Sequence, residues 1–463
     1  MRLLILLLLL AGCAKPNVLP TGDFYGTLKI GDSNFRLYLH NPQHPELTIV
    51  NFRGYKIPID VVSTDHRALH FRRSDENTQF KGEYDSQTGT IIGNWIVDDS
   101  IRHPLIFAPV LHDTIPGLHP RINKEYTYTI PVFADNIPVC DLKAQNMQIE
   151  PLNNLMQNIL EEKYKYIHSM LVARNGCLLM EEYFYGFRPE MHFGIQSATK
   201  SFVSALTGIA LNKGEIKRLD TKLCQYLPRY QDLTCNEQNK SISLHNLLTM
   251  STGLEWDEVT YEYGHEKNTS MIAAQQPDQF RYLLTRPRSN KKVFAYNSLN
   301  HLIMNYVLRE STKMENTAEM EERLIRPLEI TNYDLGQPEN DVIGDIFLRP
   351  RDMLKFGLMY QQQGVWRGKQ IVPKSWIKES TTKKIDLQSG LGYGYFWWTK
   401  QFQWKEKTID SYFAWGYGGQ YIFVVPALEL VVVFNGTNWS TDPTKYYLEI
   451  MEKYIVTSCE PAQ

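Results

Sequence analysis

The hydrophobic pattern of this chain changes its period partway along, and this change constrains the fold more than any other feature. From about residue 21 to 110, apolar and polar residues alternate in short runs that turn residues interrupt. A period of two is typical of strands that bury one face. From about residue 143 onward, runs at helical spacing are mixed with strand-like runs. Because 463 residues are too many for one ordinary core, we predict an all-β unit followed by a mixed one.

The first predicted unit spans residues 20–112. Its strand-like runs are FYGTLKI, FRLYLH, TIVNF, ALHFRR, QFKGEY, TIIGNWIV and HPLIFAPV. Short alternating strands of this kind favour a small barrel or a sandwich. Its acidic residues and histidines fall at turns or at outward positions, so we expect a scaffold, a spacer or a substrate rim and no catalysis. A proline-containing stretch then predicts a linker over residues 113–142.

The second predicted unit spans residues 143–458. It begins with a helical pattern, LNNLMQNILEEKYKY, and continues with two strand-like runs joined at Asn175-Gly176, a strong hairpin signal. Its middle is rich in helical patterns, and its C-terminal part returns to strands. Strands at both ends with helices between them predict an α+β fold, in which a sheet is flanked by helices.

Charge and composition narrow the function. Forty-nine Lys and Arg stand against fifty-one Asp and Glu, a formal charge of −2. Because no strong field would recruit nucleic acid, we expect a small molecule or a short peptide as substrate and no nucleic-acid partner. No cysteine has a histidine at metal-ligand spacing, so we expect neither a metal site nor another cofactor.

The first residues predict export. Arg2 precedes the apolar run Leu3–Leu10, which is too short for a permanent membrane span. The following Leu10-Ala11-Gly12-Cys13 resembles the bacterial lipobox, which implies a signal peptide over residues 1–12 and a lipid on Cys13. The alternative is an ordinary cleaved signal with an incidental cysteine. Because no aspartate follows Cys13, the resemblance favours an outer-membrane anchor in a bacterial cell envelope.

Export also permits disulfides. Beyond Cys13 the chain has Cys140, Cys177, Cys224, Cys235 and Cys459. We expect Cys224 and Cys235 to pair, because they bracket a loop-like stretch. The odd number leaves at least one cysteine that is free or pairs between chains.

Ser197 and Lys200 form an S-x-x-K pattern, and residues three apart lie on one face of a helix. The lysine can therefore reach the serine hydroxyl. The same pattern also starts at Ser289, Ser375 and Ser380, but the copy at Ser197 alone opens a strongly apolar helix. That context would fix a nucleophile at the helix start, where its backbone N–H faces a reacting carbonyl.

The run IQSATKSFVSALTGIAL resembles the nucleophile motif of the penicillin-recognising serine hydrolases, which include class C β-lactamases, DD-peptidases, related esterases and hydrolases of short amide oligomers such as the 6-aminohexanoate dimer. The resemblance extends over roughly residues 145–456 and implies the β-lactamase/transpeptidase fold. The family's Y-x-N element corresponds to Tyr296-Asn297-Ser298. Tyr296 matches the tyrosine, whereas Ser298 stands where asparagine is usual and Asn297 stands one position early. This departure counts against penicillin-like substrates more than against hydrolysis.

The family's third element, K-T-G or H-x-G on an inner strand, corresponds to the run WGYGGQ. In this correspondence Tyr417 takes the lysine or histidine position. Gly418 and Gly419 allow a substrate to approach the backbone closely. The resemblance then implies that Gln420 offers its backbone N–H as the second oxyanion donor, beside that of Ser197.

The resemblance implies an acyl-enzyme on Ser197, with Lys200 and Tyr296 transferring the protons. We expect a serine hydrolase that acts on an ester or an amide. A DD-peptidase or a β-lactamase-like enzyme uses the same machinery and is an alternative. An alternative of another class is a catalytically inactive module that binds envelope material.

Overall fold

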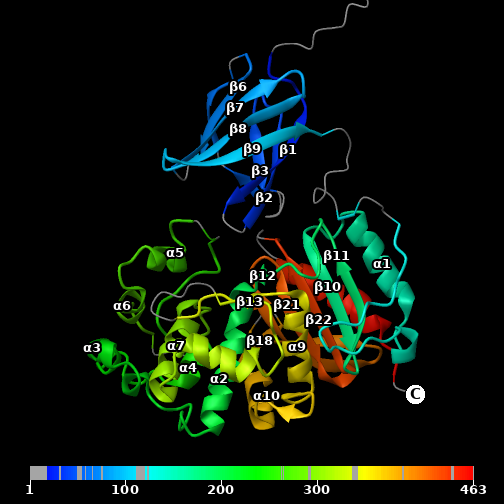
Figure 1. Cartoon of the computed structure of the whole chain (residues 1–463). Helices are drawn as coiled ribbons and strands as arrows, with labels where there is room; N and C mark the ends of the chain where they lie inside the picture. The colour runs from blue at the N-terminus through cyan, green and yellow to red at the C-terminus, as the bar shows by residue number, and fades with distance from the viewer. Residues whose placement is uncertain are drawn as a thin grey trace, which may run out of the picture. The chain divides into compact units, whose positions relative to one another are not determined.

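The computed structural model describes residues 18–461, apart from gaps at 31–32, 50–54, 58, 65, 74–76, 111–119, 122–124, 262, 264, 290–292, 336–341, 388–389 and 439–442. The predicted signal peptide and Cys13 lie outside the described residues. Contacts divide the chain into two compact units, residues 1–122 and 123–463 (Figure 1). Each unit has its own hydrophobic core.

The first unit is an antiparallel sheet with the strand order β4-β3-β2-β1-β9-β8-β7-β6-β5. Its strands are β1 (Asp23–Ile30), β2 (Ser33–His40), β3 (Glu46–Ile49), β4 (Tyr55–Ile57), β5 (Ile59–Ser63), β6 (Ala68–Arg73), β7 (Thr78–Asp85), β8 (Thr90–Val97) and β9 (Ile101–Pro109). The inward positions carry aromatic residues such as Phe71 and Phe80, whose ring centroids lie 5.2 Å apart. The two end strands of this order, β4 and β5, are separated by one residue, so the sheet curves back on itself as a barrel does. The predicted all-β unit is confirmed.

The second unit contains a sheet with the order β11-β10-β22-β21-β20-β19-β18-β17. Its strands are β10 (Ile167–Arg174), β11 (Cys177–Tyr183), β17 (Ile385–Asp386), β18 (Leu391–Tyr393), β19 (Trp398–Trp404), β20 (Lys407–Gly416), β21 (Gln420–Val425) and β22 (Leu430–Gly436). Neighbouring strands are antiparallel throughout. Shorter pairings join β12 (Phe193–Gly194), β14 (Phe347–Leu348) and β13 (Tyr333–Asp334), and β15 (Val365–Trp366) with β16 (Lys369–Gln370).

Helices pack on this sheet and form the middle of the unit. They are α1 (Ile149–Leu160), α2 (Thr199–Asn212), α3 (Gln231–Thr234), α4 (Leu244–Leu248), α5 (Thr269–Ala274), α6 (Gln279–Leu284), α7 (Leu299–Thr312), α8 (Asn316–Met320), α9 (Pro350–Gln361), α10 (Lys374–Thr381) and α11 (Pro443–Ile450). Helix α9 lies along β21 and β22, and α2 contacts both β20 and α7 (Figure 1). The predicted α+β architecture, a sheet flanked by helices, is confirmed.

The central strands are buried along their whole length and are mostly apolar. Every residue of β10, β21 and β22 is buried. An antiparallel strand alternates when one of its faces meets water, whereas continuous apolar runs such as YIFVV indicate that both faces are covered. The core of the second unit is therefore centred on these strands and on the helices that cover them.

The segment before α1 belongs to the second unit. Ile137 and Leu142 are buried in its core, although residues 113–142 read as a linker in the sequence. Cys140 forms a disulfide with Cys177 at the start of edge strand β11, and Val139 bridges to Leu178 beside it. Residues 125–142 thus cover the edge of the sheet, and the boundary between the compact units falls at 122/123.

A second disulfide joins Cys224 to Cys235, the pair expected from the sequence. The thiol of Cys459 is buried and free. No helix in the described part of the chain is both long enough and apolar enough to cross a membrane.

Candidate active site

Ser197 lies in a 3₁₀ turn, Gln196–Ala198, that leads directly into α2. Gln196 adopts a positive φ of 54°, a conformation that turns the chain sharply before the serine. One turn later, Lys200 points back and its Nζ donates to Ser197 Oγ over 2.8 Å. The i, i+3 spacing of the motif therefore brings the two side chains into direct contact.

Asp345 holds the turn before the nucleophile. Its carboxylate accepts the backbone N–H of Gln196 at 2.7 Å and that residue's side-chain amide at 3.0 Å. It also accepts the backbone N–H of Ile346 at 2.8 Å. Burial raises the pKa of Asp345 to about 6, although these hydrogen bonds act in the opposite direction. No sequence motif pointed to this residue, which lies 149 positions from its partner.

Tyr296 approaches the nucleophile from the segment before α7. Its ring stacks on that of Trp398, with centroids 5.7 Å apart, and Lys200 Nζ lies 5.0 Å from its centroid. A hydrogen bond with Ser197 favours its ionised form, but burial raises its pKa well above the usual value. The phenol is therefore neutral at physiological pH. The structure thus brings Ser197, Lys200 and Tyr296 together.

Lys200 is the residue of this group that can lose a proton near neutral pH. Its side chain is 2% exposed. Burial lowers its pKa to about 8, and the negative charges of Glu258 and Asp345 oppose that shift. At pH 7 roughly one molecule in ten then carries a neutral amine, which can act as a base.

Glu258 is a buried carboxylate that the sequence reasoning missed. It accepts Ser298 Oγ–H at 2.6 Å and the backbone N–H of Ser298 at 2.9 Å. Trp256 Nε1 and Tyr263 Oη donate to it at 2.7 and 3.3 Å. Asn297, also predicted for this site, instead accepts the N–H of Leu299, the first residue of α7, at 2.8 Å. Ser298 is thus bound to an internal acid.

The third predicted element forms the turn between β20 and β21. Gly418 and Gly419 have φ values of 86° and 106°, which glycine adopts without strain. The ring of Tyr417 lies 5.0 Å from that of Tyr263. Gln420 begins β21 with its side chain turned inward, where it donates to the carbonyl of Gly436 at 2.6 Å.

Gly416, the last residue of β20, makes the close approach between this turn and the nucleophile. A Cβ at this position would lie 2.0 Å from the carbonyl oxygen of Ile195, two residues before Ser197. Only glycine allows the strand to run so close to the nucleophile turn. The glycine-rich run was the available signal, but the sequence reasoning expected close approach of a substrate at Gly418 and Gly419 and did not foresee this contact at Gly416.

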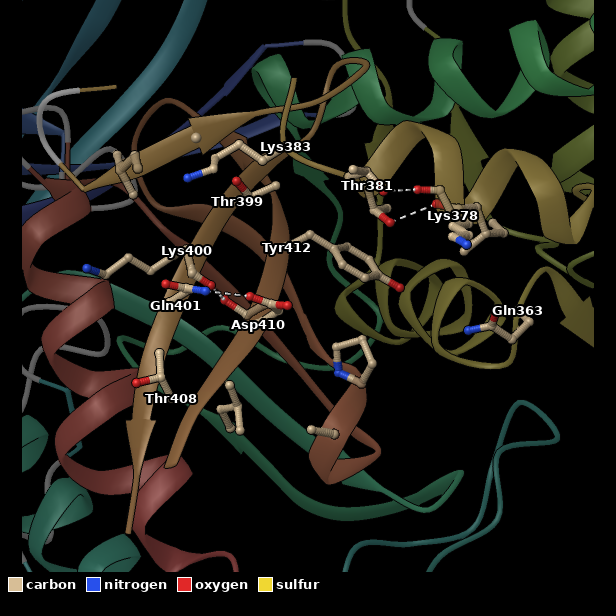
Figure 2. A pocket seen from close by; sticks show the side chains of 18 of the residues that line it. Gln363, Lys378, Thr381, Lys383, Thr399, Lys400, Gln401, Thr408, Asp410 and Tyr412 are labelled. Carbon is tan, nitrogen blue, oxygen red and sulfur yellow. Dashed lines mark hydrogen bonds between the residues drawn. The ribbon is translucent and has the colours of Figure 1, made fainter. Parts of the chain in front are cut away.

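A separate pocket of about 990 Å³ lies between α10 and strands β18 to β20 (Figure 2). It contains Ser375, Lys378 and Lys383, which belong to two further copies of S-x-x-K. In these copies the serine and lysine side chains are not hydrogen-bonded to each other, and Ser380 Oγ donates to the carbonyl of Ile377. These copies therefore lack the contact that joins Ser197 to Lys200.

The described residues contain no group of three or more His, Cys, Asp or Glu side chains that could hold a metal ion. The arrangement around Ser197 places a serine hydroxyl, a buried lysine amine and a neutral tyrosine phenol in contact with one another. Such a constellation performs acyl transfer.

The fold and this constellation are those of a serine hydrolase. The Beta-lactamase family matches residues 167–450, more than half of the chain, so the protein belongs to this family. The resemblance seen in the sequence is confirmed, and the chain is an enzyme of the serine hydrolase class. None of the curated proteins matches it significantly.

Solved structures share the fold at low sequence identity. A candidate 6-aminohexanoate-dimer hydrolase from Bacillus anthracis is similar with a TM-score of 0.54 and 19% identity, over 64% of this chain and 80% of that one. A class C β-lactamase is similar with a TM-score of 0.52 and 15% identity, over 68% of this chain and 97% of that one. A candidate β-lactamase from Bacteroides dorei is similar with a TM-score of 0.50 and 15% identity, over 63% of this chain and 90% of that one. These likenesses support the fold alone.

Proposed function

We propose that this protein hydrolyses an ester or an amide through an acyl-enzyme on Ser197. The observation that carries the proposal is the 2.8 Å hydrogen bond from Lys200 Nζ to Ser197 Oγ, together with the neutral phenol of Tyr296 on the same hydroxyl. A serine hydroxyl is a weak nucleophile until a base takes its proton. Lys200 and Tyr296 both contact Ser197 Oγ and differ in acidity, so the amine can act as the base and the phenol as the acid.

In the acylation step the neutral amine of Lys200 takes the proton of Ser197 as Oγ bonds to the substrate carbonyl carbon. The backbone N–H groups of Ser197 and Gln420 would stabilise the oxyanion. Tyr296 then donates its proton to the leaving alcohol or amine as the bond to the carbonyl carbon breaks. Lys200 returns its proton to Tyr296, which restores both residues.

In the deacylation step a water molecule attacks the acyl carbonyl while the neutral Lys200 accepts a proton from that water, directly or through Tyr296. The bond between the carbonyl carbon and Ser197 Oγ breaks, and the serine regains the proton. The products are a free acid and the resting enzyme.

The charges around the site favour an uncharged substrate. Two carboxylates, Glu258 and Asp345, act electrostatically on Lys200. Tyr417 occupies the position where relatives carry a lysine or histidine, and Ser298 Oγ is bound to Glu258. An ester or a small amide needs neither a cation for a carboxylate nor an asparagine for an acyl-side amide, whereas a penicillin-like substrate uses both. We therefore favour an esterase or small-amide hydrolase over a β-lactamase.

The decisive experiment is intact-mass spectrometry of the soluble protein, beginning after Cys13, with a fluorophosphonate and separately with benzylpenicillin. We expect a fluorophosphonate adduct on the wild type and none on Ser197→Ala. Ser375→Ala is the matched control, because it removes the serine of another S-x-x-K copy, and it should label normally.

The outcomes separate the alternatives. A stable penicillin adduct would move the substrate toward D-Ala peptides of peptidoglycan, and rapid release of hydrolysed penicillin would indicate a β-lactamase. Folded wild-type protein that takes up neither reagent would overturn the proposal and favour an inactive module that binds envelope material.

We also propose that the protein is held in the bacterial cell envelope by a lipid on Cys13. The support is the apolar run followed by Leu10-Ala11-Gly12-Cys13. Metabolic labelling with a palmitate analogue, followed by membrane fractionation, tests this. Cys13→Ser should abolish both the label and the sedimentation with membranes, and a soluble, unlabelled wild-type protein would contradict the anchor.

A further inference from the structure

We propose that Glu258 is a positioning residue of this site, which clamps the Tyr296–Ser298 segment against the nucleophile and supplies the fixed negative charge that faces Lys200. This inference rests on the proposed function, because it assigns a role within the same acyl transfer. It concerns a residue that neither the sequence motifs nor the catalytic steps above use.

The first argument is burial with full hydrogen bonding. Glu258 is 4% exposed, and each of its oxygens accepts two hydrogen bonds. Oε2 accepts the N–H groups of Trp256 and Ser298, whereas Oε1 accepts the hydroxyls of Ser298 and Tyr263. An acid held by four donors is unavailable to a substrate, so its role is to hold its partners.

The second argument is what those partners are. Ser298 is the N-cap residue of α7 and follows Tyr296 by two positions, and Glu258 binds both its backbone N–H and its hydroxyl. The helix start is therefore fixed by an acid from another segment of the chain. Because Tyr296 lies two residues before this anchor and is hydrogen-bonded to Ser197, movement of Ser298 would disturb the contact between the phenol and Ser197.

The third argument is charge. Among the described residues, the titratable groups that interact with Lys200 include Glu258, Asp345, Tyr296 and His301. Burial lowers the pKa of His301 well below its usual value, so this imidazole is neutral. The carboxylate of Glu258 favours the protonated form of Lys200 and also the neutral form of Tyr296. It thus favours the resting state in which Lys200 is protonated, and so it sets how readily the neutral amine that acylation needs is formed.

The hydrogen bonds make Glu258→Gln an informative variant. The partners at Oε2 are N–H groups, which can only donate, so the glutamine oxygen must take that position. The partners at Oε1 are hydroxyls, which can turn and accept from the glutamine amide. The variant therefore removes the charge and keeps the clamp. Ser298→Ala does the opposite, because it removes one hydrogen bond of the clamp and leaves the charge.

The experiment measures the rate of fluorophosphonate labelling of Ser197 as a function of pH, on the same soluble protein. The labelling rate should rise with pH, and we expect Glu258→Gln to move the midpoint of this rise to lower pH by about half a unit or more. The reason is that the protonated form of Lys200 loses a negative charge that stabilises it. Ser298→Ala should slow labelling roughly five- to tenfold at every pH with an unchanged midpoint, and Ser298→Thr should restore the rate. Glu255→Gln, an exposed acid three residues away, is the matched control.

If the pH midpoint of labelling in Glu258→Gln equals that of the wild type and of Glu255→Gln, the proposal that the charge of Glu258 acts on Lys200 is overturned. Normal labelling by Ser298→Ala would overturn the clamp, and this variant gives an answer even if Glu258→Gln fails to fold. Wild-type protein that does not label at all would instead overturn the proposed function, and with it the inference.

Discussion

The carboxylate of Asp345 accepts the backbone N–H of Gln196 at 2.7 Å, so a residue far along the chain holds the position directly before the nucleophile. Gln196 has a positive φ, which is unfavourable for a residue with a side chain. The hydrogen bonds to Asp345 offset part of that cost. The orientation of Ser197 is thus fixed from outside its own helix.

We expect Asp345→Asn to be more stable than the wild type at neutral pH. Burial raises the pKa of Asp345 from 3.8 to about 6, so its charged form is disfavoured in the folded state. This carboxyl therefore makes its full contribution to the free energy of unfolding below about pH 4, and that contribution falls as pH rises to about 6. Asparagine does not titrate and avoids this loss. The difference in the free energy of unfolding between the variant and the wild type should therefore shift in favour of the variant by on the order of 1–3 kcal/mol between pH 4 and 7.

Urea denaturation at pH 4 and pH 7 measures this difference. Asp386→Asn, at an exposed aspartate, is the control. A difference between Asp345→Asn and the wild type that does not change with pH would contradict the prediction.

Labelling of Ser197 should rise with pH through a midpoint near 8. The reason is that only the neutral amine of Lys200 can take the serine proton, and burial lowers its pKa to about 8. Lys200→Arg keeps a positive charge but cannot lose its proton, so we expect a rate lower by a factor of about a hundred or more and no rise near pH 8. Stopped-time mass spectrometry across pH 5–10 gives both profiles. A wild-type profile that is flat over this range would exclude Lys200 as the base.

Gly416→Ala should impair acylation while the protein stays folded. The added Cβ would lie 2.0 Å from the carbonyl oxygen of Ile195, a backbone atom that no rotamer change can move. The strand and the nucleophile turn must separate, and we expect labelling to slow at least about tenfold. Gly344→Ala is the control, since nothing lies within 4 Å of its Cβ position. Equal labelling rates for the two variants would show that the close approach has no catalytic role.

Removal of the two disulfides should destabilise the protein by different amounts. Cys140–Cys177 closes a separation of 37 residues and Cys224–Cys235 one of 11. The entropy of loop closure predicts losses of about 4 and about 3 kcal/mol for the respective Cys→Ser double variants. Denaturant titration of each double variant measures the free energies of unfolding. The opposite order would indicate that the longer loop is already restricted in the unfolded chain.

The features that could be predicted are those determined by residues that lie close together in the sequence. Alternating residues gave the strands of the first unit, and a three-residue spacing brought Lys200 to Ser197. The apolar runs of β21 and β22 identified the centre of the sheet. A family resemblance directed attention to Tyr296, whose position before α7 is also local.

The parts that could not be predicted depend on contacts between distant segments. Asp345 reaches Gln196 across 149 positions, and Glu258 reaches Ser298 across 40. The sequence alone does not show whether an acidic side chain faces water or a buried amide group. The serine at position 298 was visible as a departure from the family pattern, but its partner becomes evident only when Trp256 and Ser298 are seen on the same carboxylate.

The disulfide between Cys140 and Cys177 also determines how the enzyme would carry mechanical load. Tyr128 donates to the carbonyl of Leu179, and Cys140 is bonded covalently to the start of β11, at the edge of the sheet. Tension applied through the N-terminal part of the chain reaches this covalent bond before it reaches α1 or α2. Such tension therefore enters the second unit through the edge strand β11.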